Sequence, residues 1–281
     1  MLRKGFALAA LGLALVGGQA LAATTQEEPK AMSWSFQGPL GKFDQAQLQR
    51  GYKVYREVCS ACHSMSLLSF RNLGEKGGPF FDEKYPNPND NPYVKSISKD
   101  YQYDDIDSET GDIVKRPGTP ADRFPNPFPN EAAARASNGG ALPPDLSDMA
   151  KAREGGPAYV YSLLTGYEEP PKGLTLSPGK HYNPYFPGDV GASWSGAADK
   201  TPKGGFIGMP PPLAPDKVTF DDGSKSTVDQ QAKDVSAFLA WAAEPKMEER
   251  KSFGLAAMIY LLIFSGLLWF SYRKIWKNVA H

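Results

Sequence analysis

The sequence predicts a mainly α-helical protein, in which one domain with long loops is followed by a single C-terminal membrane-spanning helix. Three observations support this prediction. Two segments carry apolar residues at helical spacing, the stretch between them is rich in proline, and residues 253–272 contain no charged residue. The 281 residues, of which 41% are hydrophobic, suffice to bury a core of ordinary size without disulfide bonds.

Both long helices of the domain are marked by capping residues. The first is predicted to begin after Asp44, with Gln47 as the partner residue of a capping box. Apolar residues then share one helical face up to the first cysteine: Leu48, Tyr52, Tyr55 and Cys59. The second helix is predicted to begin after Thr227, with Gln230 as its capping partner, and to end before Pro245.

These two helices are expected to pack against each other. Phe238 and Trp241 on the second helix are predicted core residues, and they should face Gly51, where a missing side chain allows close approach. No strand ladder is evident, and the proline-rich stretch 79–130 is expected to be loop. Shorter elements are expected at three places: helices near 146–153 and 157–165, and a small hairpin near 218–223.

The N-terminus has the pattern of a cleavable export signal, residues 1–22. Two basic residues precede an apolar run, and Ala20 and Ala22 fit a peptidase site. An uncleaved anchor helix is the alternative, but two consecutive glycines interrupt the run and make it short for a membrane span. The body, residues 23–250, is therefore expected to be exported.

The C-terminal segment 251–272 is predicted to be a transmembrane anchor. Its uncharged part, residues 253–272, would span roughly 30 Å as a helix, which is the thickness of the hydrocarbon layer. Arg273, Lys274 and Lys277 follow directly, so the positive-inside rule places the tail 273–281 in the cytoplasm. We therefore expect a single-pass protein of a bacterial inner membrane, with its large domain in the periplasm.

Charge excludes one class of function. Acidic and basic residues number 31 each, so no basic excess points to nucleic-acid binding. All 31 acidic residues but only 25 basic residues lie in 23–250, which gives this body a formal charge of −6. Six acidic residues follow one another without an intervening base on a stretch that we expect to be an exposed loop: Asp100, Asp104, Asp105, Asp107, Glu109 and Asp112.

One motif carries specific chemistry, Cys59-Ser60-Ala61-Cys62-His63. Two thiols at this spacing can form thioethers with the vinyl groups of one haem, and the next residue presents an imidazole to the iron. A structural zinc site would need four ligands, and the chain has two cysteines and three histidines, one of them beyond the membrane anchor. A thioredoxin-like dithiol would follow a strand, whereas a helix precedes this motif. The motif therefore predicts one covalent haem c, with His63 as an iron ligand.

The sixth iron ligand is expected to be a methionine, because a thioether raises the reduction potential and closes the iron to oxygen. Four methionines are excluded as iron ligands, because they lie in the signal, beside or within the membrane, or too near His63. Met32, Met149 and Met209 remain as candidates. Met209 lies between glycines and three prolines that would stiffen a ligand loop. It is the favoured candidate, and His181 is the alternative.

Segments across most of the mature chain resemble the cytochrome c1 family, the membrane-anchored haem subunits of ubiquinol-cytochrome c reductase. They are Phe43-Asp44, Gln49-Arg50-Gly51-Tyr52, the haem motif, Ala134-Arg135-Ala136-Ser137-Asn138-Gly139-Gly140-Ala141-Leu142-Pro143-Pro144-Asp145-Leu146-Ser147, Ser162-Leu163-Leu164-Thr165-Gly166-Tyr167, Asn183-Pro184-Tyr185-Phe186-Pro187-Gly188, Ile207-Gly208-Met209 and Trp241-Ala242-Ala243-Glu244-Pro245. One departure from the family pattern is the stretch 189–205, which lengthens the loop before Met209.

The resemblance implies a cytochrome c-type fold and specific residue roles. Cys59 and Cys62 would bind the haem, and His63 and Met209 would be its axial ligands. It further implies that Pro143 belongs to the wall of the haem pocket, while Arg153 and Tyr159 meet the propionates.

The resemblance also implies the path of the electron. It would pass from the Rieske iron-sulfur subunit to a basic cytochrome c, in a complex with cytochrome b. The protein would then carry electrons without being an enzyme on its own. A haem peroxidase would need an open sixth position, and a haem sensor would need a sizeable cytoplasmic domain. A membrane-anchored c-type subunit of a terminal oxidase is the alternative.

Overall fold

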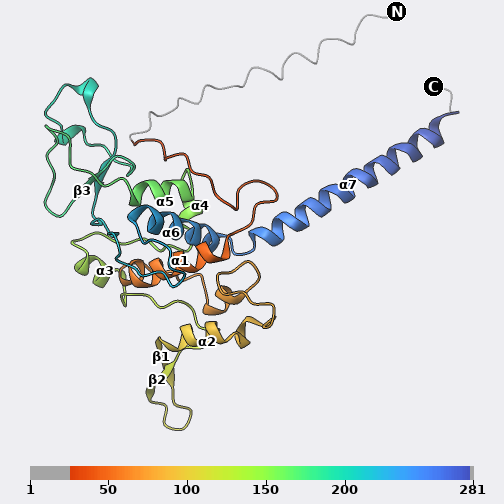
Figure 1. Cartoon of the computed structure of the whole chain (residues 1–281), viewed down its shortest axis with the longest axis horizontal. Helices are drawn as coiled ribbons and strands as arrows, with labels where there is room; N and C mark the ends of the chain where they lie inside the picture. The colour runs from red at the N-terminus through yellow and green to blue at the C-terminus, as the bar shows by residue number, and fades with distance from the viewer. Residues whose placement is uncertain (1–25, 279–281) are drawn as a thin grey trace, which may run out of the picture.

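The computed structural model describes residues 26–278, and the regular structure of this part is mostly helical (Figure 1). Its α-helices are α1 Gln45–Glu57, α2 Pro92–Lys99, α3 Glu131–Ser137, α4 Met149–Ala152, α5 Pro157–Leu164, α6 Val228–Ala243 and α7 Met247–Trp276. Its strands are β1 Gln102–Ile106, β2 Ile113–Pro117, β3 His181–Asn183 and β4 Gly205–Ile207. Short 3₁₀ helices lie at Cys59–Ala61, Phe70–Gly74, Pro88–Asp90, Gly191–Ser193 and Ala198–Lys200. The predicted export signal lies outside the described residues.

The two long helices of the domain, α1 and α6, begin where their capping residues predicted. The Asp44 carboxylate accepts a hydrogen bond from the Gln47 amide at 2.9 Å, and the Thr227 hydroxyl accepts one from the Gln230 amide at 3.1 Å. Each bond satisfies an amide that has no partner inside the helix. These caps fix the first turn of each helix.

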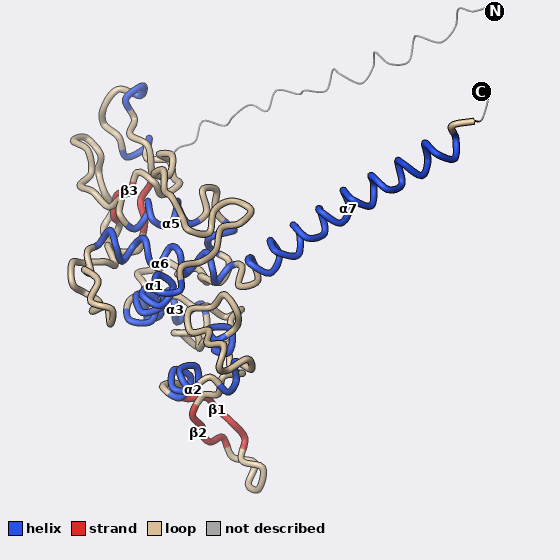
Figure 2. The backbone as a smooth tube through the Cα atoms, turned by 45° about the vertical axis from the view of Figure 1, so that its right-hand side comes forward, coloured by secondary structure: helices blue, strands red, loops and turns tan. Residues whose placement is uncertain are grey.

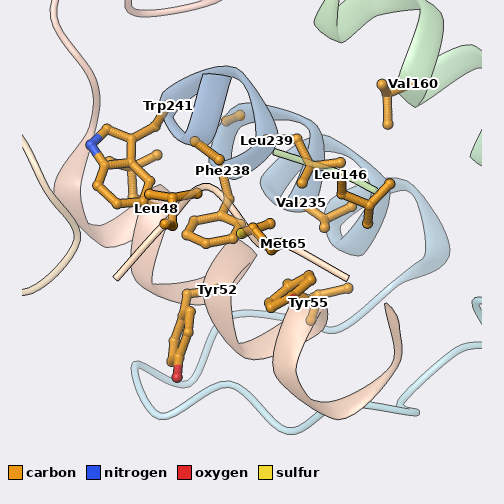
Figure 3. Packing of buried hydrophobic residues seen from close by; sticks show 14 of the residues in the cluster. Leu48, Tyr52, Tyr55, Met65, Leu146, Val160, Val235, Phe238, Leu239 and Trp241 are labelled. Atoms are coloured by element: carbon orange, nitrogen blue, oxygen red, sulfur yellow. The ribbon is translucent and has the colours of Figure 1, made fainter. Parts of the chain in front are cut away.

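The core of the domain lies between α1 and α6 (Figure 3). Phe238 and Trp241 of α6 are fully buried, as predicted, and their rings stack with centroids 5.5 Å apart. The ring of Phe238 also contacts those of Tyr52 and Tyr55 on α1, at centroid distances of 5.7 Å and 5.8 Å. Aromatic contacts of this kind stabilise beyond the area they bury.

A buried carboxylate joins the two helices next to this core. Asp234 of α6 is fully buried and accepts hydrogen bonds from three side chains: Arg50 Nε at 2.7 Å, Gln47 Nε2 at 3.1 Å and Gln230 Nε2 at 2.8 Å. A buried charge is tolerated when it is paired and hydrogen-bonded in this way. Arg50 extends the network to Asp222 at 2.7 Å.

The stretch 79–130 is not a continuous loop, which corrects the prediction. It contains α2 and an antiparallel hairpin of β1 and β2 that projects from the domain (Figure 2). The run of acidic residues from Asp100 to Asp112 therefore begins just before β1 and continues through the hairpin turn. The register places Asp104 opposite Lys115, and these two residues form a salt bridge. Asp105, opposite Val114, forms a diagonal salt bridge with Arg116 of β2. Ion pairs of this kind accompany a strand pair whose side chains are mostly exposed.

Two smaller predictions also need correction. No hairpin forms near 218–223, because Val218 and Phe220 are buried in the core instead of pairing with another strand. The helix expected near 146–153 is shortened to α4, Met149–Ala152. The helix expected near 157–165 is confirmed as α5, which begins with Pro157 in its first turn.

A second, smaller hydrophobic cluster lies in the lobe that contains the loop 189–205. It is formed by Leu174, Tyr182 and Val190, and it lies beside the short antiparallel pair of β3 and β4. The expectation that no strands pair was wrong here too. Figures 1 and 2 place this lobe and the β1–β2 hairpin at opposite ends of the domain.

Helix α7 leaves the domain as one long rod (Figure 1), and it is long and apolar enough to cross a membrane. Its first turn is bound to the domain. The Glu248 carboxylate accepts a hydrogen bond from the Phe43 amide at 2.9 Å, and the Lys251 ammonium donates to the carbonyls of Phe36 and Gly41 at 2.6 Å and 3.3 Å. The anchor therefore continues directly from the domain, without a flexible linker.

Candidate haem site

The cysteine motif forms a compact turn directly after α1. The amides of Cys62 and His63 both donate to the Cys59 carbonyl, at 3.1 Å and 2.9 Å, which places the two thiols and the imidazole on one turn. Both cysteines are free thiols. Burial raises the pKa of the Cys59 thiol to about 12, so this sulfur carries its proton at neutral pH. The turn therefore offers two unpaired thiols for covalent attachment.

The His63 imidazole is held from one side. Its Nδ1 lies 2.8 Å from the Pro144 carbonyl oxygen. A carbonyl can only accept, so Nδ1 carries the proton and the lone pair of Nε2 is available for a metal. Burial lowers the pKa of His63, which favours the neutral imidazole that iron requires.

The residues around Pro144 form one wall of a hollow beside the motif. This hollow has a volume of about 350 Å³ and is lined by Cys62, Pro127, Phe128 and Pro143, among others. The lining is mixed, because the polar residues Asn126, Asn130, Glu131 and Asp145 also contribute to it. Pro143 lies in this lining, together with Cys62 of the haem motif.

The loop of Met209 approaches the same region from another side. A methyl group added to Gly208 would lie 3.0 Å from the Ala141 Cβ, so this loop packs against the segment that leads to Pro144. The Tyr167 hydroxyl donates to the Met209 carbonyl at 3.1 Å. Further along the loop, the Lys217 ammonium is close enough to Cys59 to oppose the effect of burial on the thiol pKa. Met209 itself is partly exposed.

The other candidate ligands differ in their surroundings. Met32 and Met149 are partly buried and pack against the hydrophobic core. His181 pairs with Ile207 in the β3–β4 ladder, two residues before Met209, and its ring lies 6.4 Å from that of Tyr167. His181 therefore lies near the loop of Met209, whereas Met32 and Met149 belong to the core.

Arg153 and Tyr159 lie close to each other. Burial raises the pKa of the Tyr159 hydroxyl, and the neighbouring Arg153 guanidinium partly opposes this shift. Arg153 is exposed at the end of α4, and Tyr159 is buried in α5. Burial raises the pKa of Tyr167, and the nearby Tyr159 hydroxyl adds to this shift.

Sequence reasoning missed the contributions of Pro144 and Tyr167. Pro144 acts through its backbone carbonyl, which no residue-type pattern reveals. Tyr167 lies 42 residues before Met209, and only the fold brings its hydroxyl to that loop. Both residues lie in segments that carried the family resemblance, and that was the available signal.

A helical domain that presents two free thiols and one oriented imidazole on a single turn, with a long apolar helix behind it, defines the class of membrane-anchored c-type cytochromes. Comparison with known proteins narrows this class. A family model described as the Cytochrome C1 family matches residues 34–279. The chain belongs to the cytochrome c1 family, whose cofactor is a c-type haem.

Three relatives illustrate this membership. Cytochrome c1 of Rhodospirillum rubrum is 40% identical, over 98% of this chain and 97% of that protein. The mitochondrial "Cytochrome c1, heme protein" of Saccharomyces cerevisiae is 46% identical, over 82% of this chain and 66% of that protein. "Cytochrome b/c1" of Bradyrhizobium diazoefficiens is 43% identical over 98% of this chain, which spans only 41% of that longer protein.

Proposed function

We propose that this chain is the haem-bearing electron carrier of a ubiquinol-cytochrome c reductase complex. Cys59 and Cys62 bind the haem through thioethers, and His63 and Met209 are its axial ligands. The observation that carries this proposal is the 2.8 Å contact between His63 Nδ1 and the Pro144 carbonyl, beside two free thiols. It leaves Nε2 oriented for iron at the point where the thiols can hold the porphyrin.

The bound haem supplies one reversible electron at its iron. The chain's own residues hold it and tune it. His63 provides a neutral nitrogen donor, and Met209 provides a soft sulfur donor on a loop that Tyr167 and the following prolines restrain. With His63 and Met209 both bound to its iron, the haem would favour electron transfer over oxygen or peroxide chemistry. The protein is thus not an enzyme by itself.

Three further residues complete the proposed site. Pro143 forms part of its apolar wall, which its place on the hollow beside Cys62 supports. Arg153 and Tyr159 offer a guanidinium and a hydroxyl to the propionates, which their mutual contact supports. Charged and polar donors of this kind bind carboxylates well.

The partners follow from family membership and charge. The electron arrives from a Rieske iron-sulfur subunit and leaves to a basic cytochrome c, in a complex that also contains cytochrome b. The acidic body, with a formal charge of −6 in residues 23–250, favours a basic acceptor. The name "Cytochrome b/c1" of the relative that joins both parts supports the association with cytochrome b.

The proposed location is a bacterial inner membrane, crossed once. Helix α7 spans it, the haem domain lies in the periplasm, and the basic residues Arg273, Lys274 and Lys277 keep the C-terminus in the cytoplasm. Protease added to cells with a permeable outer membrane should remove the haem domain and leave the anchor. Protection of the haem domain would contradict this topology.

The function is tested by reductase activity in membranes. Replacing Cys59 and Cys62 by alanine should abolish quinol-driven reduction of cytochrome c, while quinol still reduces the b-type haems. Met149→Leu, which changes a side chain packed against the core, is the control and should retain the activity. Full cytochrome c reduction without these two cysteines would refute the proposed role. Purification with a terminal oxidase, and not with cytochrome b, would favour the alternative function.

A further inference from the structure

The segment that follows His63 is fastened to the segment that follows Pro144 by one carboxylate. Asp145 Oδ2 accepts hydrogen bonds from the Ser64 hydroxyl at 2.8 Å, the Ser66 hydroxyl at 2.7 Å and the Ser66 amide at 2.9 Å. Its Oδ1 accepts one from the Ser147 amide at 2.8 Å. We refer to Asp145 and these three serines as the Asp145 clamp.

Two backbone amides strengthen the clamp. The Leu146 amide donates to the Ser64 carbonyl at 2.9 Å, and the Leu67 amide donates to the Ser147 hydroxyl at 3.1 Å. Ser64 directly follows His63, and Asp145 directly follows Pro144. The clamp therefore fixes both ends of the hydrogen bond that orients the imidazole.

The clamp also places a negative charge beside the imidazole. Burial alone would raise the pKa of Asp145, but the hydrogen bonds from Ser147 and Ser66 outweigh burial and hold this pKa well below its ordinary value. Asp145 is therefore ionised at neutral pH. Its charge also acts on His63, where it opposes the lowering of the imidazole pKa by burial.

We infer that Asp145 is a positioning residue: it orients the His63 ring through Pro144, and its negative charge favours the oxidised haem. This inference rests on the proposed function, because it requires His63 to be an iron ligand. The oxidised iron carries one more positive charge than the reduced iron, so a fixed anion nearby stabilises it preferentially.

The test compares Asp145→Asn with Asp148→Asn in the full-length, membrane-bound protein. Both changes remove one negative charge, but Asp148 is exposed and its side chain does not cap α4. A redox titration should show that Asp145→Asn shifts the ratio of reduced to oxidised haem by roughly tenfold, an increase of about 59 mV for one electron. Asp148→Asn should leave the potential close to that of the unmodified protein.

Ring orientation needs a separate readout, the g values of the oxidised haem in electron paramagnetic resonance. Ser66→Ala keeps the charge of Asp145 and removes one of its donors. It should move the g values while changing the potential less than Asp145→Asn does. If Asp145→Asn yields no haem protein, an unchanged spectrum of Ser66→Ala decides against the inference.

The outcomes separate the inference from the function on which it rests. Absence of a denaturation-resistant, low-spin haem in the unmodified protein would overturn the proposed function. Presence of that haem, with equal potentials and equal g values in Asp145→Asn and Asp148→Asn, would overturn only the role of Asp145.

Discussion

Gly51 of α1 lies against the backbone of Asp234 in α6, so closely that a methyl group on Gly51 would stand 2.1 Å from the Asp234 carbonyl oxygen. The Asp234 side chain meanwhile binds Arg50, the neighbour of Gly51. Backbone and side chain of one residue thus fix α1 against α6. Because the cysteine motif follows α1 directly, this contact sets the direction from which the haem-binding turn enters the site.

Gly51→Ala should therefore destabilise the domain strongly. The added methyl group meets backbone and not a movable side chain, so α1 and α6 must separate, and we expect a loss of about 3 kcal/mol or more. Thermal unfolding of the holoprotein measures it. Gly254→Ala is the matched control, because a methyl group there has no neighbour within 4 Å. Equal stability of the two variants would contradict the close contact.

Met209→Leu should remove the sixth ligand without disturbing the core. Leucine has no donor atom, so we expect the reduced haem to bind carbon monoxide. The reduction potential should also fall, which corresponds to a decrease of roughly a hundredfold or more in the ratio of reduced to oxidised haem. Met149→Leu should change neither property. If His181→Leu opens the iron and Met209→Leu does not, His181 is the ligand.

The helices were predictable from the sequence because their signals are local. Asp44 and Thr227 cap α1 and α6 through residues three positions away, and apolar spacing identifies their buried faces. The β1–β2 hairpin was missed because ion pairs such as Asp104 with Lys115 depend on a strand register that composition does not reveal. Val218 was assigned to a hairpin because its burial depends on distant residues.

The residues of the site also differ in whether the sequence alone reveals them. The motif Cys59–His63 is contiguous and therefore legible in the sequence. Pro144 and Tyr167 act through contacts with residues 81 and 42 positions away, which only the tertiary structure provides. The acidic run from Asp100 to Asp112 could also be identified from the sequence. Its partial neutralisation by Lys115 and Arg116 could not be predicted, because it depends on the strand pairing.

The acidic run is a candidate docking surface for a basic cytochrome c, and its uncompensated acids are those at the hairpin tip: Asp107, Glu109 and Asp112. Electron transfer to a basic cytochrome c should slow as ionic strength rises, since salt screens the attraction between the partners. Neutralising the three tip acids together should flatten this dependence. The control replaces three exposed acids near the β3–β4 lobe: Glu168, Glu169 and Asp199. An unchanged slope in the tip variant would show that docking lies elsewhere.

The ion pair at the base of the β1–β2 hairpin should lose its stabilising effect at acid pH. The Arg116 side chain binds Asp122 and holds the pKa of that carboxyl well below its ordinary value. A carboxyl with a lowered folded pKa stabilises above its unfolded pKa of about 3.9 and loses this contribution as pH falls through the folded value. Asp122→Asn should therefore weaken amide-exchange protection of residues 102–117 at pH 7.

The difference between this variant and the unmodified protein should shrink as the pH falls below about 4. Asp104→Asn is the control, because Asp104 and Lys115 are both exposed and such pairs contribute little. A difference that stays constant from neutral to acid pH would argue against the ion pair at the hairpin base.

The central claim is that Cys59 and Cys62 hold one haem whose iron His63 binds. The most direct measurement is a haem stain of the denatured chain on a gel, combined with the optical spectrum of the membrane-bound protein before denaturation. We predict a stained band with one haem per chain and a low-spin spectrum, and loss of the stain when both cysteines become alanine. A stain that survives without these cysteines, or an unmodified chain without any stain, would contradict the account.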